Sequence, residues 1–219
     1  MVERPKTGAG DVAHAAIRAL VSTIPIAGSA AAELFSLVIS PPLTKRRDEW
    51  IASIAQGLTL LERQVRGFRI EDLSSNEAFI TTVMQATQVA LRTHQKEKLL
   101  ALRNAVLNVA LHRAPDEDLQ LLYLSFADSF TQWHLRILKY FHEHPTQVKS
   151  VYESGELIAA YPELDGKQAF YEQIVRDLYA RGLVVSNVTP GTATAFMPFA
   201  GRATQLGQAF LEFISSPVA

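Results

Sequence analysis

Apolar residues recur every three or four positions between residues 50 and 68. This stripe consists of Trp50, Ile51, Ile54, Leu58, Leu61, Val65 and Phe68. Such spacing marks one face of an α-helix, and a strand, with its period of two, cannot produce it. The pattern predicts a long amphipathic helix that begins after Pro41-Pro42, and we expect this proline pair to end the helix before it.

Further helices are predicted up to residue 130. Ser74 and Glu77 have capping-box spacing and place a helix start at the residue after Ser74. Residues 94–98 interrupt the pattern, which then resumes until Pro115. Three carboxylates at 116–118 indicate a new helix start, where they oppose the positive end of the helix dipole. The positions expected to be buried include Phe79, Val83, Met84, Ala86, Ala90, Leu102, Val106, Val109, Leu119, Leu122, Phe126 and Phe130.

The region before residue 44 is unusually apolar. Between Ala19 and Leu43 the only charged side chain is Glu33. We expect a helix over 11–23, a tight turn around Pro25 and Gly28, and a second helix packed closely through small residues. Together with the helices up to residue 128, this predicts an N-terminal helical bundle spanning 11–128.

The last third of the chain changes character. Thr131 is placed to cap a helix, and Gly182 follows a later helix at the position where a left-handed residue is favoured. Pro190-Gly191 lies between two β-rich runs and predicts a hairpin turn. The expected elements are helices at 131–144, 148–160 and 167–181, strands at 183–188 and 193–199, and a helix at 204–214. Phe170, Ile174 and Leu178 are expected to face inward from the helix at 167–181.

This order of elements resembles a winged helix. The segment LYARGLVV, with Leu178, Gly182 and Val184, resembles the passage from a recognition helix into a wing. ATQLGQAFLEFI, with Gly207 and Phe210, resembles the helix that follows the wing in bacterial winged-helix proteins. The resemblance implies a mainly α fold, in which the bundle precedes a C-terminal winged helix over 130–215 with a two-stranded β-ribbon. The whole layout also resembles bacterial abortive-infection alpha-type proteins, which are associated with phage defence.

Composition narrows the class of protein. The chain has 219 residues, of which 48% are hydrophobic and 20% charged, and a net charge of −1. This is an ordinary globular balance, without the basic excess common in nucleic-acid binders. Cysteine is absent, which excludes disulfides, thiolate nucleophiles and cysteine-bound zinc. The first residues lack the layout of a secretory signal, so we expect a cytoplasmic protein.

DNA binding is one function that the winged-helix resemblance implies. The candidate DNA contacts are Lys167, Gln168, Tyr171, Arg176 and Arg202, which we expect to face outward. Glu172 and Asp177 offset the two cations of the expected recognition helix, and carboxylates repel DNA phosphates. This even charge favours a role other than DNA binding.

Contact with a protein partner is a second function. Phe196, Met197 and Phe199 lie in the wing, and a two-stranded ribbon in so small a domain cannot bury both of its faces. These apolar residues therefore either dock on the bundle of the same chain or form a candidate partner contact. Self-association is a further form of such contact.

Membrane contact is a third function. The candidate membrane contacts are Ile24, Ile26, Leu34, Phe35, Lys45, Arg46 and Arg47. The apolar residues could enter a bilayer surface under a trigger while the basic group meets anionic headgroups. The same pattern also fits a tightly packed helical pair followed by a solvated helix start.

Motifs for catalysis and cofactor binding are absent from the sequence. There is no G-x-x-x-x-G-K-[ST], G-x-G-x-x-G, G-x-S-x-G or H-E-x-x-H. His142 and His144 flank Glu143, but the side chains of residues two apart on a helix diverge, so the triplet does not predict a metal site. His134 is expected as a polar contact between the bundle and the winged helix, or on the surface. We expect no enzymatic activity, no cofactor and no metal. The favoured function is an interaction protein, in bacterial defence or regulation, that uses the winged helix as a protein-contact module.

Overall fold

A computed structural model describes the backbone of residues 29–145, 155–186 and 199–217, and the side chains of 43–145, 155–185 and 202–217. The predicted helix over 11–23 and turn at 24–28 lie outside the described residues, as do the start of the predicted helix over 148–160 and the hairpin turn at 189–192.

The first described helix is longer than predicted. Helix α2 runs without interruption from Ser29 to Gln64 and so passes through Pro41-Pro42. The prediction that this pair ends a helix was wrong. Proline lacks an N–H and removes two intrahelical hydrogen bonds here, but its fixed φ is compatible with helical backbone. Beyond the pair, Trp50, Ile54, Leu58 and Leu61 are buried as the apolar stripe predicts.

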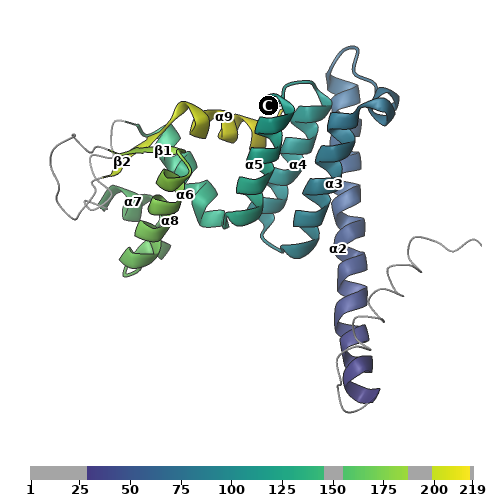
Figure 1. The fold of residues 1–219 in the computed structure, drawn as a ribbon, viewed down its shortest axis with the longest axis horizontal. Helices are drawn as coiled ribbons and strands as arrows, with labels where there is room; N and C mark the ends of the chain where they lie inside the picture. Colours follow the sequence, from purple (N-terminus) through teal and green to yellow (C-terminus); the bar gives the residue numbers. More distant parts are fainter. Residues whose placement is uncertain (1–28, 146–154, 187–198, 218–219) are drawn as a thin grey trace, which may run out of the picture. The chain divides into compact units, whose positions relative to one another are not determined.

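Three helices follow α2 and lie side by side (Figure 1). They are α3 (Glu77–Arg92), α4 (Lys96–Ala110) and α5 (Glu117–Ser129), and a short 3₁₀ helix, η1 (Ile70–Ser75), precedes them. The Asn76 side chain accepts a hydrogen bond from the Phe79 N–H at 3.0 Å, so the cap of α3 is Asn76 instead of Ser74. Asp116 caps α5 through the Leu119 N–H at 3.1 Å, which confirms the predicted acidic helix start.

Several apolar positions that the periodicity assigned to the core lie on the surface. The exposed fractions are 53% for Ile51, 60% for Met84 and 39% for Leu122. In α5 the buried face instead contains Tyr123 and Leu124 beside Phe126. Residue type alone does not show which side of a helix its neighbours cover, so the apolar pattern assigned these single residues to the wrong side.

The C-terminal part contains four α-helices and a ribbon in the described residues. Helices α6 (Gln132–Glu143), α7 (Gly155–Ala160) and α8 (Gln168–Ala180) are followed by β1 (Val184–Ser186), β2 (Phe199–Ala203) and α9 (Gln205–Ile214), with a 3₁₀ turn, η2 (Pro162–Leu164), before α8. Strands β1 and β2 are antiparallel, with an irregular register between Val184 and Ser186. The second strand begins where the predicted run 193–199 ends. The predicted fold class, mainly helical with a small two-stranded ribbon, is confirmed.

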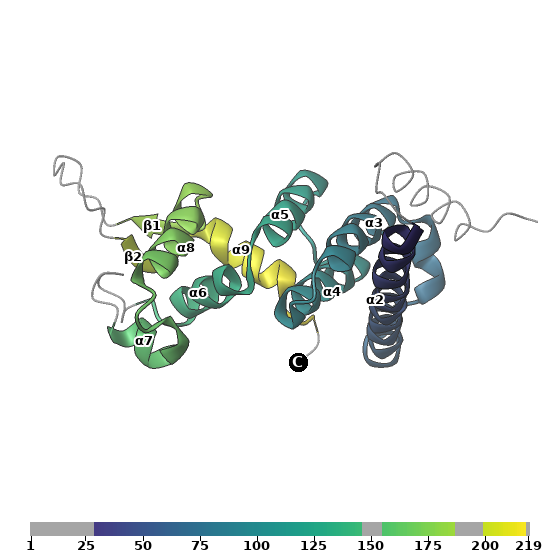
Figure 2. The ribbon, with the colours of Figure 1, turned by 90° about the horizontal axis from the view of Figure 1, so that it is seen from below.

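Helix α9 joins the two parts of the chain. It packs against α4, α6 and β2 (Figure 2). The buried side chains of Asn104 and Asn108 on α4 donate to the carbonyls of Ile214, Phe213 and Ser215, at 3.0, 2.9 and 2.9 Å. These bonds satisfy the C-terminal carbonyls of α9, which have no partner within the helix. Residues 49–219 cluster as one compact unit, and the predicted domain boundary near residue 130 stays a prediction.

The end of α4 contains a strained residue whose replacement should stabilise the protein. His112 has a φ of 54°. Its N–H donates to Val109 O and the Arg113 N–H to Asn108 O, the Schellman pattern in which glycine is favoured. We expect His112→Gly to raise the free energy of unfolding by about 1 kcal/mol, because glycine adopts this backbone without a β-carbon clash.

Urea unfolding of the purified chain measures this effect. His112→Ala is the matched control, because it also removes the imidazole but keeps the β-carbon. If His112→Ala stabilised the protein as much as His112→Gly, the gain would come from the side chain and not from backbone strain.

Candidate protein-contact surfaces

Helix α8 occupies the position of the expected recognition helix. It begins after Lys167, and Gly182, with a φ of 71°, follows its end as predicted. The buried face of α8 consists of Tyr171, Ile174, Val175 and Leu178. Tyr171 is only 2% exposed, so the prediction that it faces outward as a DNA contact was wrong. Its spacing of three, four and seven residues from the other buried positions places it on the same helical face.

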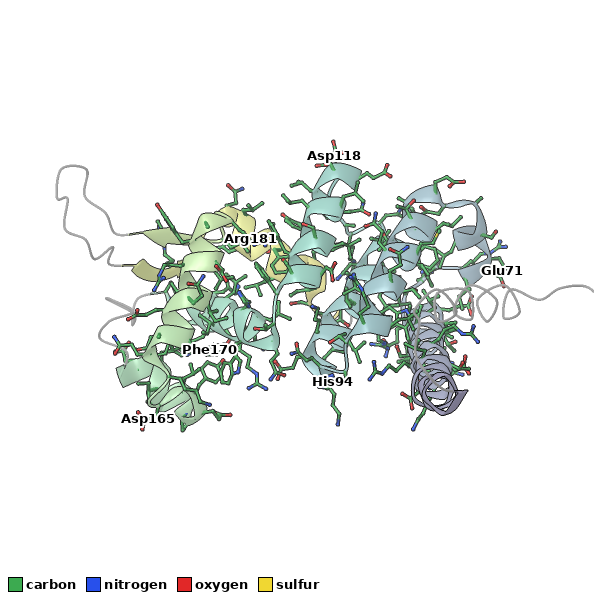
Figure 3. All side chains as sticks on the ribbon, turned by 60° about the horizontal axis from the view of Figure 1, so that its bottom comes forward. Glu71, His94, Asp118, Asp165, Phe170 and Arg181 are labelled. Atoms are coloured by element: carbon green, nitrogen blue, oxygen red, sulfur yellow. The ribbon has the colours of Figure 1, made fainter. Side chains whose placement is uncertain are left out.

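The exposed residues Ala169, Phe170, Gln173, Arg176 and Ala180 of α8 are here called the α8 outer face. Phe170, predicted to point inward, is 40% exposed. Figure 3 shows Phe170 near the first turn of α8 and Arg181 at the opposite end, beside α5. The α8 outer face therefore combines one aromatic ring, one cation and small side chains.

The polar groups of α8 are engaged with one another. The Gln168 amide donates to Glu172 Oε1 at 2.8 Å, and the Gln173 amide donates to Asp177 Oδ1 at 2.8 Å. Arg176 lies 3.5 Å from Glu172 Oε2 and donates to Gln173 Oε1 at 3.2 Å. Two of the candidate DNA contacts, Gln168 and Arg176, thus both interact with the carboxylate of Glu172.

The remaining candidate contacts are only partly described. Lys167 precedes α8 and is exposed, and Arg202 is exposed on β2. Phe199 is the first residue of β2, but only its backbone is described. Phe196 and Met197 lie outside the described residues. Ile24 and Ile26 are also outside them, whereas Leu34 and Phe35 are described only as backbone of α2.

The basic group that follows the apolar segment is on the surface. Lys45, Arg46 and Arg47 are exposed, and Arg47 Nε lies 3.3 Å from the Asp48 carboxylate. In the described ranges, no helix combines the length and the apolarity that crossing a bilayer requires. Conditional contact of this segment with a membrane stays a prediction.

A buried polar junction connects α8 to the helices before it. His134 on α6 is 6% exposed, as expected for a polar contact between the bundle and the C-terminal part. Its ring stacks on Phe130, with 4.7 Å between centroids, and its Nε2 lies 3.4 Å from Asp177 Oδ2 on α8. The Arg181 guanidinium lies over the rings of Phe126 and Phe130 at 5.5 and 5.2 Å. Such cation–π contacts fix the end of α8 against α5.

The protonation state of His134 follows from its partners. The Thr131 backbone N–H donates to His134 Nδ1 at 3.1 Å, and a backbone N–H cannot accept. Nδ1 therefore carries no proton, and the Nε2–H faces Asp177. Burial lowers the pKa of His134, with Arg181 and Lys98 acting in the same direction and Asp177 opposing them. The neutral ring is thus the form that caps α6.

Lys98 supports the same junction from α4. It is 9% exposed, and its Nζ donates to the carbonyls of Asp128 and Phe130 at 2.5 and 3.0 Å. Burial lowers the pKa of Lys98, although the nearby Asp128 carboxylate opposes this. Sequence reasoning missed Lys98 because it stands in the polar interruption 94–98, and its partners are thirty residues away.

A cavity of about 780 Å³ lies between α4 and α6. Residues of α9, including Leu211, Glu212 and Ile214, line its floor, and Tyr161 contributes from the α7–η2 turn. We call it the α4–α6 groove. No sequence motif predicted it, because its walls come from three elements far apart in the chain.

The histidines near the end of α6 do not converge. Glu143 lies 3.7 Å from Lys139 Nζ, and the His144 ring stacks on Tyr140. Among the side chains in the described ranges, no three His, Asp or Glu groups gather as metal ligands. Comparisons of the chain with protein-family models, with curated proteins and with solved structures gave no match.

Proposed function

We propose that the chain is a non-catalytic interaction protein, and that α6, α7, α8, β1 and β2 form a winged helix that serves as a protein-contact module. The element order, helix, helix, helix and ribbon, supports the winged-helix assignment. The observation that carries the function is the α8 outer face, on which Phe170, Arg176 and small residues are exposed.

The chemistry of this face fits a protein better than DNA. Aromatic residues and arginine are enriched at protein interfaces, where a few such side chains supply most of the binding energy. Phe170 offers apolar area, and the flanking alanines allow a partner to approach closely. A DNA backbone would instead meet the Glu172 carboxylate, and Arg176 would have to leave that carboxylate to reach a phosphate or a base.

Site-specific cross-linking tests this proposal. With the photoreactive p-benzoylphenylalanine in place of Phe170, we expect a discrete adduct of the full chain with a partner protein, or with a second copy, in the cells that produce it. The adduct should decrease at least about tenfold when Arg176→Ala is added, since both residues belong to one contact. The same reagent in place of Met84, which is more exposed but on α3, is the matched control.

Adducts of equal amount and mass from positions 170 and 84 would contradict a specific contact. Fluorescence anisotropy with duplex DNA tests the competing function directly. Binding that weakens with salt and is abolished by Arg176→Glu or Arg202→Glu would show that the winged helix binds DNA instead.

A further inference from the structure

The side chain of Asn104 on α4 has an acceptor without a donor. Asn104 is 5% exposed, and its side-chain NH2 group donates to Ile214 O at the end of α9. Because only the NH2 group can donate to a carbonyl, this bond fixes the orientation of the amide and turns Oδ1 away from Ile214. Within the described residues Oδ1 has no hydrogen-bond partner. A buried amide oxygen is rarely left without a donor, so we expect a donor from outside the chain.

The Asn104 oxygen faces the α4–α6 groove. Every side-chain nitrogen or oxygen that is fully enclosed in the described part of the chain has a hydrogen-bond partner. Asn104 Oδ1 has none, so it must reach accessible space, and the groove is the cavity that Asn104 lines. The volume of this cavity, about 780 Å³, lies within the range of small-molecule pockets. The wall of a cavity with room for a small molecule therefore contains an unpaired acceptor.

The charged side chains that line the groove leave one carboxylate without a cation. Arg136 Nε donates to both carboxylate oxygens of Glu97, each at 2.8 Å, and Lys139 Nζ lies 3.7 Å from Glu143 Oε1. The third lining carboxylate, Glu212 on α9, is exposed and forms no ion pair with the described side chains. With the lining histidine counted as neutral, three carboxylates stand against two cations, so the net charge of the groove is −1.

The end of α9 also favours a cation. The C-terminal end of a helix carries the partial negative charge of the helix dipole, and the bond from Asn104 to Ile214 O places this end at the wall of the groove. Leu135 and Leu211 supply apolar surface to the same cavity, and Tyr161 adds an aromatic ring, which attracts organic cations. The unpaired polar groups of the groove are thus acceptors, and much of the remaining lining is apolar.

We propose that the α4–α6 groove binds a small organic cation, an amine whose ammonium group donates to Asn104 Oδ1, whose charge is balanced by Glu212, and whose apolar body lies on Leu211. An anion would meet the unpaired carboxylate, and an apolar molecule without a donor would leave Oδ1 unpaired. This site is separate from the α8 outer face, and either site can function if the other does not.

Two-dimensional NMR of the isotope-labelled full chain, titrated with phenethylamine, tests the site. This amine is a cation at neutral pH and has an aromatic body. We expect saturable shifts of the Asn104 side-chain amide signals and of the Leu100 backbone amide, with a dissociation constant on the order of 1 mM. Hydrocinnamate, an anion of similar size, is the matched ligand. It should bind at least about fivefold more weakly, because the unpaired Glu212 carboxylate attracts the amine and repels the anion.

The first pair of variants removes the acceptor. Asn104→Ala should weaken the binding of phenethylamine at least about tenfold, because a hydrogen bond to a charged group is lost. Asn108→Ala is the matched control and should change the affinity less than about twofold. Asn108 is also on α4, is 5% exposed and donates to carbonyls at the end of α9, but it does not line the groove. The Leu100 backbone amide reports binding in both variants.

The second pair of variants removes a charge. Glu212→Gln should weaken the binding of phenethylamine roughly two- to fivefold, the effect of one exposed charge pair. Glu117→Gln, which removes an exposed carboxylate on α5 outside the groove, should leave the affinity unchanged. Thermal unfolding of all four variants confirms that they are folded.

Three outcomes would overturn the proposal. The first is that phenethylamine at up to about 10 mM leaves the Asn104 and Leu100 signals unchanged. The second is that hydrocinnamate shifts them as strongly, which would mean that the groove accepts any apolar molecule. The third is an equal loss for Asn104→Ala and Asn108→Ala, which would mean that binding depends on the packing of α9 and not on the unpaired oxygen.

Discussion

Replacing Gly207 with alanine is expected to lower the free energy of unfolding by about 2 kcal/mol or more, although alanine is the better helix former by about 1 kcal/mol. A β-carbon at this position of α9 would lie 2.2 Å from the Leu183 carbonyl oxygen. That oxygen cannot move aside, because it accepts the Thr204 N–H at 3.0 Å and continues directly into β1. Thr204 also donates its hydroxyl to Gly182 O at 2.7 Å and accepts the Gly207 N–H at 3.0 Å.

The substitution therefore forces α9 away from the start of β1. Differential scanning calorimetry should show a fall in Tm of roughly 4–8 °C for Gly207→Ala. Gln208→Ala is the matched control, since residue 208 is exposed on the same helix. This substitution should change the free energy of unfolding by no more than about 0.5 kcal/mol. A variant Gly207→Ala with an unchanged or higher Tm would contradict the close approach of α9 to Leu183.

Gly207 also shows where sequence reasoning stops. The glycine belongs to the segment that resembles the helix after a wing, but its physical role depends on a carbonyl 24 positions earlier. Local signals were more reliable. The burial of Trp50, Ile54, Leu58 and Leu61, the acidic start at Asp116 and the left-handed Gly182 were all predicted correctly, because each depends on residues within a few positions of one another.

The candidate surfaces could be predicted only in part. The even charge of α8 was visible in the sequence, but the pairing of Arg176 with Glu172 and the exposure of Phe170 were not. The side chains of Phe170 and Tyr171 are adjacent and point only about 100° apart around the axis of α8. The apolar pattern does not resolve which of the two faces the core. The α4–α6 groove was not predicted, because a helical stripe indicates which residues face the core and not where the core is left uncovered.

His134 connects stability to pH. At neutral pH its unprotonated Nδ1 accepts the Thr131 N–H and so caps α6, inside a junction that also contains Asp177, Arg181 and Lys98. Protonation would replace this acceptor with a donor that faces another donor. Loss of a helix cap costs about 0.5–2 kcal/mol. The lowered pKa of His134 means that the unfolded chain binds this proton more readily than the folded chain.

The direction of the pH effect follows from that difference. The contribution of His134 to the free energy of unfolding is fully present above the pKa of about 6.5 that histidine has in the unfolded chain. It decreases as the pH falls from there toward the lower folded pKa, and it is constant below that value. We therefore expect the free energy of unfolding of the wild-type chain, measured in urea, to be smaller at pH 5 than at pH 7.5.

The variant His134→Gln separates this group from the other titrating residues. Glutamine three residues after a threonine cap can accept the Thr131 N–H in the usual capping box, and it does not titrate. The exposed histidines His94 and His142 remain in both proteins, so their contributions cancel in the comparison. We expect the decrease between pH 7.5 and pH 5 to be smaller in His134→Gln than in the wild-type chain. Equal decreases in the two proteins would show that His134 is not the group that couples the junction between α6 and α8 to pH.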